Sequence, residues 1–167
     1  RDLETAQICI RSALTGHLVL STLHTNDAPT AITRLVDIGI EPYLVAPSLL
    51  LVCAQRLIRK LCPDCKQAYE PSAEERKSFK TKVDLIYKAK GCAKCNQLGY
   101  KGRSCIVEVM VVNKELQALI MQNVSFQKIN EVARANGMQT LYESAIKKVE
   151  AGVTSLEEAL AVTFAGD

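Results

Sequence analysis

Cys62-Pro63-Asp64-Cys65 and, 26 residues further along, Cys92-Ala93-Lys94-Cys95 are the two stretches that decide how the middle of this chain folds. Each places two thiols on one tight turn, and such a turn can supply two corners of a tetrahedron. Two turns together therefore complete the four-cysteine set of a structural zinc site. Four protein ligands leave no open coordination position, so such a site stabilises the fold and does no catalysis.

Two other interpretations of the four cysteines stay open: two independent redox pairs, or four buried free thiols. Zinc is favoured because apolar periodicity fades between Cys62 and Arg103, where Lys, Glu and turn residues dominate. A segment without a hydrophobic core needs another source of stability, which a metal can supply. The long spacing between the two pairs predicts a helical insertion over 72–87.

Length and composition are those of a globular protein, with 167 residues of which 48% are hydrophobic and 23% charged. No leader peptide and no apolar run of about 20 residues is visible, so no transmembrane segment is predicted. Paired cysteines in an odd total of seven favour metal over disulfides and hence a cytoplasmic location. Cys9, Cys53 and Cys105 lie in apolar surroundings and are expected to be small buried hydrophobic residues.

Positive charge is concentrated in the middle of the chain. Thirteen Lys/Arg face five Asp/Glu between Arg56 and Arg103, whereas the rest of the chain carries a charge of −5. This segment either meets an acidic partner or simply keeps a small domain soluble. Basic residues do not alternate with aromatic ones as they do in nucleic-acid binders, so no nucleic-acid partner is expected.

The first third of the chain predicts helices joined to buried strands. Apolar spacing predicts helices over 2–12, 28–38 and 42–53, and the run 17–23 suits a buried strand of a parallel sheet. Residues 55–61 are either a strand or the end of the preceding helix. Helix, strand and helix with short joints indicate an α/β sheet.

The last third predicts a strand over 103–112 and then four short helices. Asn113 and Ser125 are positioned to cap the first two of these helices. Thr140 with Glu143, and Thr154 with Glu157, match capping boxes that open the last two. Four capped helices in succession predict a small helical bundle.

Several segments together resemble one family, the secretion ATPases that power type II secretion and type IV pilus assembly. The segments are Arg1–Thr5, Leu14–Asn26, Ala31–Leu35, Ala54–Leu57, the two cysteine pairs, Gly99–Arg103 and Thr154–Glu158. The tetracysteine insertion resembles the secretion and pilus-extension branch. One departure is Gly102-Arg103-Ser104-Cys105, where the family usually has glycine at the last position, which puts the local turn in question.

The resemblance implies an α/β fold: part of a truncated RecA-like ATPase core half (1–61), an inserted tetracysteine zinc module (62–103), and a strand with a C-terminal helical bundle (104–167). It implies a hexameric ATP hydrolase that uses ATP and magnesium, is cytoplasmic, and is held at the inner membrane by partners such as a platform protein. No phosphate loop of the form G-x-x-x-x-G-K-[ST] is present, and in the family the Walker B strand directly precedes Arg1. This chain alone is therefore predicted not to hydrolyse ATP.

The family's histidine box matches His17 and His24, which the resemblance implies lie near the γ-phosphate. Either histidine can instead be an ordinary strand residue, and seven residues apart they point to opposite faces of a regular strand. Asp2 either orients a residue of the site or only caps the first helix. Arg34 and Arg56 are candidates for contacting nucleotide or a neighbouring subunit, or are ordinary surface ion-pair partners.

A second function class competes with the motor. The missing phosphate loop and the basic middle segment also fit a stand-alone, zinc-dependent adaptor that binds proteins without nucleotide chemistry. The two hypotheses differ in one observable property: only a motor carries a phosphate loop elsewhere in the same protein.

Overall fold

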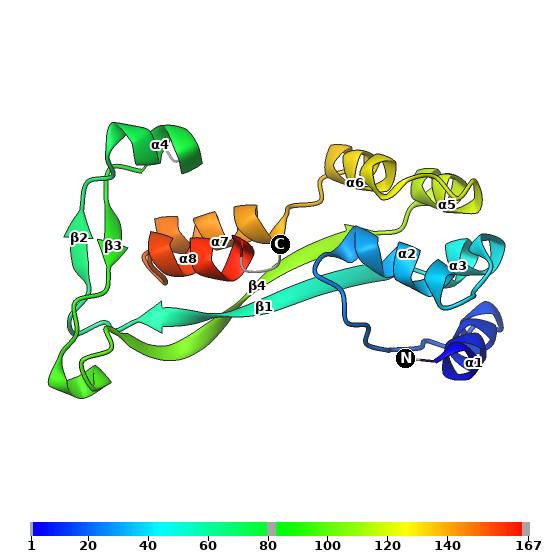
Figure 1. The fold of residues 1–167 in the computed structure, drawn as a ribbon, viewed down its shortest axis with the longest axis horizontal. Helices are drawn as coiled ribbons and strands as arrows, with labels where there is room; N and C mark the ends of the chain where they lie inside the picture. Colours follow the sequence, from blue (N-terminus) through cyan, green and yellow to red (C-terminus); the bar gives the residue numbers. More distant parts are fainter. Residues whose placement is uncertain (1, 80–82, 165–167) are drawn as a thin grey trace. The chain divides into compact units, whose positions relative to one another are not determined.

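The computed structural model describes residues 2–79 and 83–164, which form helices and two small sheets (Figure 1). The predicted α/β class is confirmed. The chain divides into two compact units: Arg1–Ala54 with Glu108–Gln139, and Gln55–Val107 with Thr140–Asp167. The elements are α1 Leu3–Leu14, α2 Ala28–Asp37, α3 Pro42–Ser48, β1 Leu51–Leu61, β2 Gln67–Tyr69, α4 Ala73–Phe79, β3 Ile86–Lys88, η1 Ala93–Cys95, β4 Tyr100–Val111, α5 Lys114–Met121, α6 Phe126–Ala135, α7 Leu141–Glu150 and α8 Leu156–Phe164.

The first unit is a cluster of helices, and side chains cap the N-termini of α1, α2 and α5. Asp2 and Asp27 accept hydrogen bonds from the backbone amides of Thr5 and Thr30, both at 2.8 Å, which satisfies free donors of α1 and α2. Helix α3 packs on α1, α2 and α5, and α6 packs on α2 and α5. The fully buried residues at these contacts include Val45, Leu116 and Ile129. Apolar burial between helices therefore holds this unit together.

A buried carboxylate accepts a hydrogen bond from the first residue of α2. Glu108 of β4 is 4% exposed, and its Oε1 accepts a 2.7 Å hydrogen bond from the backbone amide of Ala28. The positive end of the helix dipole favours an anion at this position. Glu108 thus ties β4 to the first turn of α2.

The second unit contains most of β1 and part of β4, the antiparallel pair of β2 and β3, the short helix α4, the 3-10 turn η1, and helices α7 and α8. Strand β1 pairs with β4 in one two-stranded sheet, and β2 pairs antiparallel with β3 in the other, with Ala68 opposite Tyr87. Helices α7 and α8 pack on each other and both contact β3. The predicted capping box of α7 is confirmed, since Thr140 and Glu143 exchange hydrogen bonds at 3.2 and 2.9 Å.

The strand predicted over 17–23 is wrong. These residues form neither helix nor strand, and Leu18 and Leu20 are 77% and 89% exposed. A buried strand requires neighbours that satisfy its backbone groups. The two sheets of the described residues contain only β1 with β4 and β2 with β3, so this apolar run has no strand beside it there.

Two predicted helices are shorter than expected, one predicted from apolar spacing and one from the spacing of the cysteine pairs. The helix predicted over 42–53 ends at Ser48, with Pro47 inside its last turn. Strand β1 begins at Leu51 and includes residues 55–61, which the sequence left as either strand or helix. Within the described residues, the insertion predicted as helical over 72–87 is helical over Ala73–Phe79, and residues 80–82 lie outside that description. Its end is β3, which the sequence pattern did not reveal.

Two smaller corrections concern α8 and the lone cysteines. The cap of α8 is Ser155, whose Oγ accepts from the amide of Glu158, and not Thr154 with Glu157. Cys53 and Cys105 are exposed. Successive residues of a strand point to opposite faces, and the neighbouring Ala54 of β1 and Ile106 of β4 occupy the buried faces. Cys105 is extended within β4, so glycine is not required there.

Candidate metal centre

The first cysteine pair sits on the turn that follows β1. The backbone carbonyl of Cys62 accepts hydrogen bonds from the amides of Cys65 at 3.3 Å and Lys66 at 3.0 Å, which closes the turn around Pro63. The amide of Cys62 donates to the carbonyl of Gly99 at 2.9 Å, which anchors this turn beside the second one. Local hydrogen bonding thus sets the spacing of the two thiols.

The second pair sits on the short 3-10 turn η1. The carbonyl of Cys92 accepts from the amides of Cys95 and Gln97, at 3.1 and 2.9 Å. The chain leaves the turn through two left-handed residues, Asn96 with φ 51° and Gln97 with φ 63°. Two residues after Gln97, glycine is required at position 99, because a Cβ there would lie 2.6 Å from the Cβ of Ala89.

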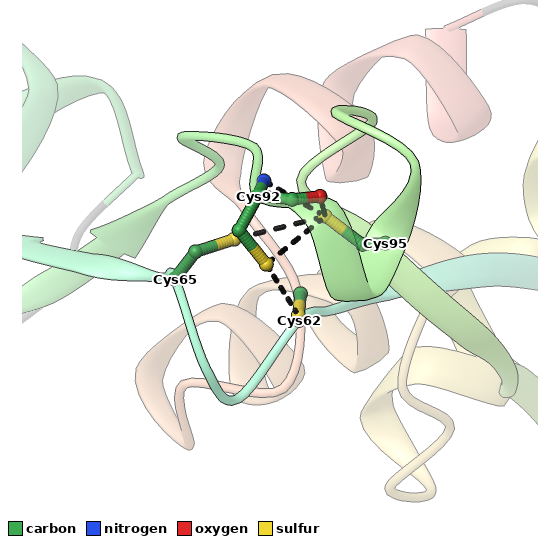
Figure 2. A group of neighbouring side chains, drawn as sticks. All are labelled: Cys62, Cys65, Cys92 and Cys95. Atoms are coloured by element: carbon green, nitrogen blue, oxygen red, sulfur yellow. Dashed lines mark hydrogen bonds between the residues drawn. The ribbon is translucent and has the colours of Figure 1, made fainter.

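The four thiols converge on one point (Figure 2). The Sγ atoms of Cys62 and Cys92 are 4.0 Å apart, those of Cys65 and Cys95 are 3.8 Å apart, and those of Cys92 and Cys95 are 3.7 Å apart. All four lie within 4.8 Å of one another. A tetrahedral zinc with Zn–S bonds of about 2.3 Å requires sulfur atoms about 3.8 Å apart. The geometry therefore fits a single four-coordinate ion.

The electrostatic surroundings of Cys95 favour its thiolate. Burial raises the pKa of this thiol, but hydrogen bonds from the backbone amides of Cys92 and Gly99, each 3.2 Å from Sγ, outweigh burial and lower it to about 7. Burial raises the pKa of Cys65 to about 12. Of these two thiols, Cys95 therefore loses its proton at the lower pH.

A charged pair joins the two turns outside the sulfur cluster. Lys94 Nζ donates to Asp64 Oδ1 at 2.5 Å. This hydrogen bond holds the pKa of Asp64 below its ordinary value. Both side chains are partly exposed, so water screens the pair and its contribution to stability is small. This ion pair therefore adds little to the stability of the two turns.

Four close cysteines can hold a metal ion, and an all-sulfur tetrahedral set suits zinc or iron. Backbone amides that donate to the sulfur of Cys95 provide the outer hydrogen bonds that metal sites use to orient their ligands. The residues present thus fit a structural metal ion, because four protein ligands leave no coordination position for a substrate.

The other predicted site residues are not part of this cluster. His24 and His17 are exposed on the segment without secondary structure, where Thr15 Oγ1 lies 3.1 Å from His17 Nδ1. Asp2 caps α1, the plainer of its two predicted roles. Arg34 is exposed on α2, and a guanidinium nitrogen of Arg56 donates to the carbonyl of Val162 at 2.6 Å. Any role of these residues toward nucleotide stays a prediction.

One buried network in the same unit was missed by sequence reasoning. Glu158 of α8 accepts three hydrogen bonds from Arg59 of β1: from its backbone amide and its Nε, both at 2.9 Å, and from a terminal nitrogen. The Arg59 guanidinium also lies 4.3 Å from the ring centre of Tyr100. Glu158 lies in the matched segment Thr154–Glu158, but Arg59 lies in none of the matched segments, so the resemblance did not indicate that the two residues touch.

Known proteins of similar sequence belong to bacterial secretion and pilus systems. Residues 1–161 match the family described as Type II/IV secretion system protein. The chain is 51% identical to the Type II secretion system ATPase E of Vibrio cholerae, over 98% of this chain and 33% of that protein. It is 45% identical to the Type IV pilus assembly ATPase PilB of Thermus thermophilus, over 98% of this chain and 19% of that protein.

Solved structures share the fold at lower identity. The X-ray structure of the ATPase DotB of Legionella pneumophila has a TM-score of 0.63 at 20% identity, over 100% of this chain and 37% of that one. The DotB structure of Yersinia pseudotuberculosis has a TM-score of 0.65 at 16% identity, over 98% of this chain and 35% of that one. The chain spans about a third or less of the curated relatives named above. The match over nearly all residues shows that this chain belongs to the family of type II/IV secretion system proteins.

Proposed function

We propose that Cys62, Cys65, Cys92 and Cys95 bind one structural zinc ion. The convergence of four Sγ atoms within 4.8 Å carries this proposal. Zinc is preferred because four cysteines on two C-x-x-C turns, with no open position, are the usual ligand set of a structural zinc ion. Lys94 and the backbone amide of Cys92 would offset part of the −2 charge of the metal tetrathiolate. The ion would stabilise the turns and leave the chemistry to other parts of the protein.

Elemental analysis of the purified chain tests this proposal. Protein prepared in reducing buffer is expected to contain one equivalent of zinc per chain, because all four ligands are supplied by the same chain. Inductively coupled plasma mass spectrometry gives the stoichiometry directly. One equivalent of iron per chain would show that the site binds iron and not zinc. Absence of any metal after zinc-supplemented expression would refute a metal site at these cysteines.

We infer further that the chain is the C-terminal part of an ATPase that powers type II secretion or type IV pilus assembly. Identity of 45–51% over 98% of the chain to proteins named as such ATPases carries this inference. In the intact protein, ATP and magnesium would bind in a ring of subunits, and a platform protein at the inner membrane would receive the motion. Within the described residues no helix is both long and apolar enough to span a bilayer. Attachment to the inner membrane through partners is part of this proposal.

His24 is the proposed contact to the γ-phosphate, and His17, Asp2, Arg34 and Arg56 are proposed to support the same site. His24 is exposed and directly precedes the segment that caps α2, so an imidazole there is accessible to a ligand. The basic tetracysteine module (62–103) is the proposed contact to the platform protein. Both proposals require the rest of the protein.

A chimera tests the motor hypothesis. The matching third of the Vibrio cholerae ATPase is replaced by this chain, and the chimera is expected to hydrolyse ATP whereas this chain alone does not. His24→Ala is expected to lower kcat by about 100-fold with little change in KM, since a lost contact to developing phosphate charge acts in the transition state. A coupled phosphate-release assay measures both constants.

Ser21→Ala, an exposed residue of the same segment, is the matched control and is expected to leave kcat unchanged. An unaltered kcat for His24→Ala would remove His24 from the site. A folded, zinc-loaded chimera without ATP hydrolysis would instead favour the adaptor, in which the tetracysteine module binds proteins without nucleotide chemistry.

A further inference from the structure

The end of β1 is bonded to the turn between α7 and α8. The amide of Leu61 donates to the carbonyl of Val153 at 2.8 Å, and the hydroxyl of Thr154, which is fully buried, donates to the carbonyl of Arg59 at 2.8 Å. Leu61 directly precedes the metal ligand Cys62. The first cysteine turn therefore begins one residue beyond a strand end that is bonded to this helix turn.

Lys66, which directly follows the ligand Cys65, reaches the same helix turn. Its Nζ donates to the carbonyl of Gly152 at 3.0 Å and lies 4.3 Å from the ring centre of Tyr87. Gly152 ends α7, and a cation at a helix C-terminus is favoured by the helix dipole. A Cβ at Gly152 would lie 2.9 Å from the Tyr87 ring, so only glycine permits this approach.

Apolar side chains extend the contact. Ile86 of β3 is buried, and together with Phe79 of α4 it lines the same small cavity as Val149 of α7 and Leu156 of α8. Tyr87 and Ile86 belong to the segment between the two cysteine turns. The helix turn thus contacts residues next to the first cysteine turn and residues just before the second.

We propose that Lys66 couples metal binding at the four cysteines to the position of the α7–α8 pair. The proposal rests on the proposed metal site. Lys66 and Tyr87 are 21 positions apart in the sequence, and bonding of the two cysteine turns to one ion would hold them together. The cation–π contact between the Lys66 ammonium and the Tyr87 ring, which lies against Gly152, forms only when the two residues are held together. Loss of the ion would therefore loosen α7 and α8 as well as the cysteine turns.

Hydrogen–deuterium exchange of the full chain, with zinc and with a chelator, tests this coupling. With free zinc at about 100 times its Kd, exchange over 62–99 is expected to slow by about 100-fold. Exchange over 148–158 is expected to slow by at least about tenfold, since these amides open together with the turns. Peptides from α5, which belongs to the other compact unit, are expected to be unaffected.

Lys66→Met keeps the length of the side chain and removes its charge, and it alters no ligand. The variant is expected to bind one zinc but to lose about tenfold of the zinc-dependent protection over 148–158, the value of one charge-assisted hydrogen bond. Lys60→Met, on an exposed position of β1, is the matched control and is expected to behave as wild type. Wild-type protection of 62–99 without protection of 148–158, or equal behaviour of the two variants, would overturn the coupling and leave the metal site standing. Absence of zinc binding would overturn both.

Discussion

Cys62→Ser is expected to abolish stable zinc binding and to unfold the segment 62–99. Serine replaces a thiolate by a neutral hydroxyl, which is a poor zinc ligand. Changes to groups that only support the ligands already cost about 10–100-fold in metal affinity, and loss of a ligand exceeds that. The segment has few buried apolar residues of its own, among them Ile86 and the ligands Cys62 and Cys95, so metal binding supplies much of its folding free energy. A chelating dye measures bound zinc, and limited proteolysis reports the unfolding.

Cys105→Ser provides the matched control for this substitution. Cys105 is an exposed thiol on β4 and is not part of the sulfur cluster, so its replacement is expected to leave zinc content and protease resistance unchanged. Complete zinc release from wild type that left 62–99 as protease-resistant as before would contradict a structural role for the metal.

Glu158→Ala is expected to lower the free energy of unfolding by about 2–3 kcal/mol. The Glu158 side chain is 6% exposed and accepts the backbone amide and two side-chain nitrogens of Arg59. Alanine leaves that amide without its acceptor, whereas the Arg59 side chain, 56% exposed, regains water and limits the cost. For a chain of this size the loss corresponds to about 5–10 °C in Tm, which calorimetry measures. Glu157→Ala, exposed on the same helix, is expected to change Tm little.

The contribution of Glu158 to the free energy of unfolding is expected to fall as the pH falls. Burial raises the pKa of its carboxyl, but hydrogen bonds from Arg59 outweigh burial and hold the pKa below its ordinary value of 4.5. A folded-state pKa below the unfolded value gives stability that is complete above the unfolded value and is lost as the pH falls through the folded one. Glu158→Gln does not titrate, so its deficit relative to wild type should shrink on acidification below pH 4.5. A deficit that stays constant there would show that the ion pair contributes nothing.

Helix boundaries were predictable because their signals are local. Asn113 and the Thr140–Glu143 box each act within one turn and were placed correctly, and Asp2 takes one of its two predicted roles. Ser125 occupies the N-cap position of α6 as predicted, but its side chain makes no capping hydrogen bond. The errors concern segments whose structure depends on distant partners. The run 17–23 has the composition of a strand, but composition does not provide a neighbouring strand. The capping box at Thr154 failed because Glu158 binds Arg59 and the Thr154 hydroxyl binds the carbonyl of Arg59, 95 positions away.

In the candidate metal centre, too, the sequence determined the local features and the tertiary structure determined the rest. The spacing of each C-x-x-C pair determined that each turn offers two thiols side by side, since four residues suffice to form that turn. Family membership was also determined by the sequence, because the matching segments cover nearly the whole chain.

Only the tertiary structure decided that the two turns meet with their sulfur atoms about one tetrahedral edge apart. It also decided that Lys66 contacts Gly152 after α7 and the ring of Tyr87, and that Glu158 of α8 binds Arg59 of β1. These contacts join residues far apart along the chain, and their free energy becomes available only when several of them form together. No local pattern of residues records such a condition, because it is a property of the folded chain as a whole.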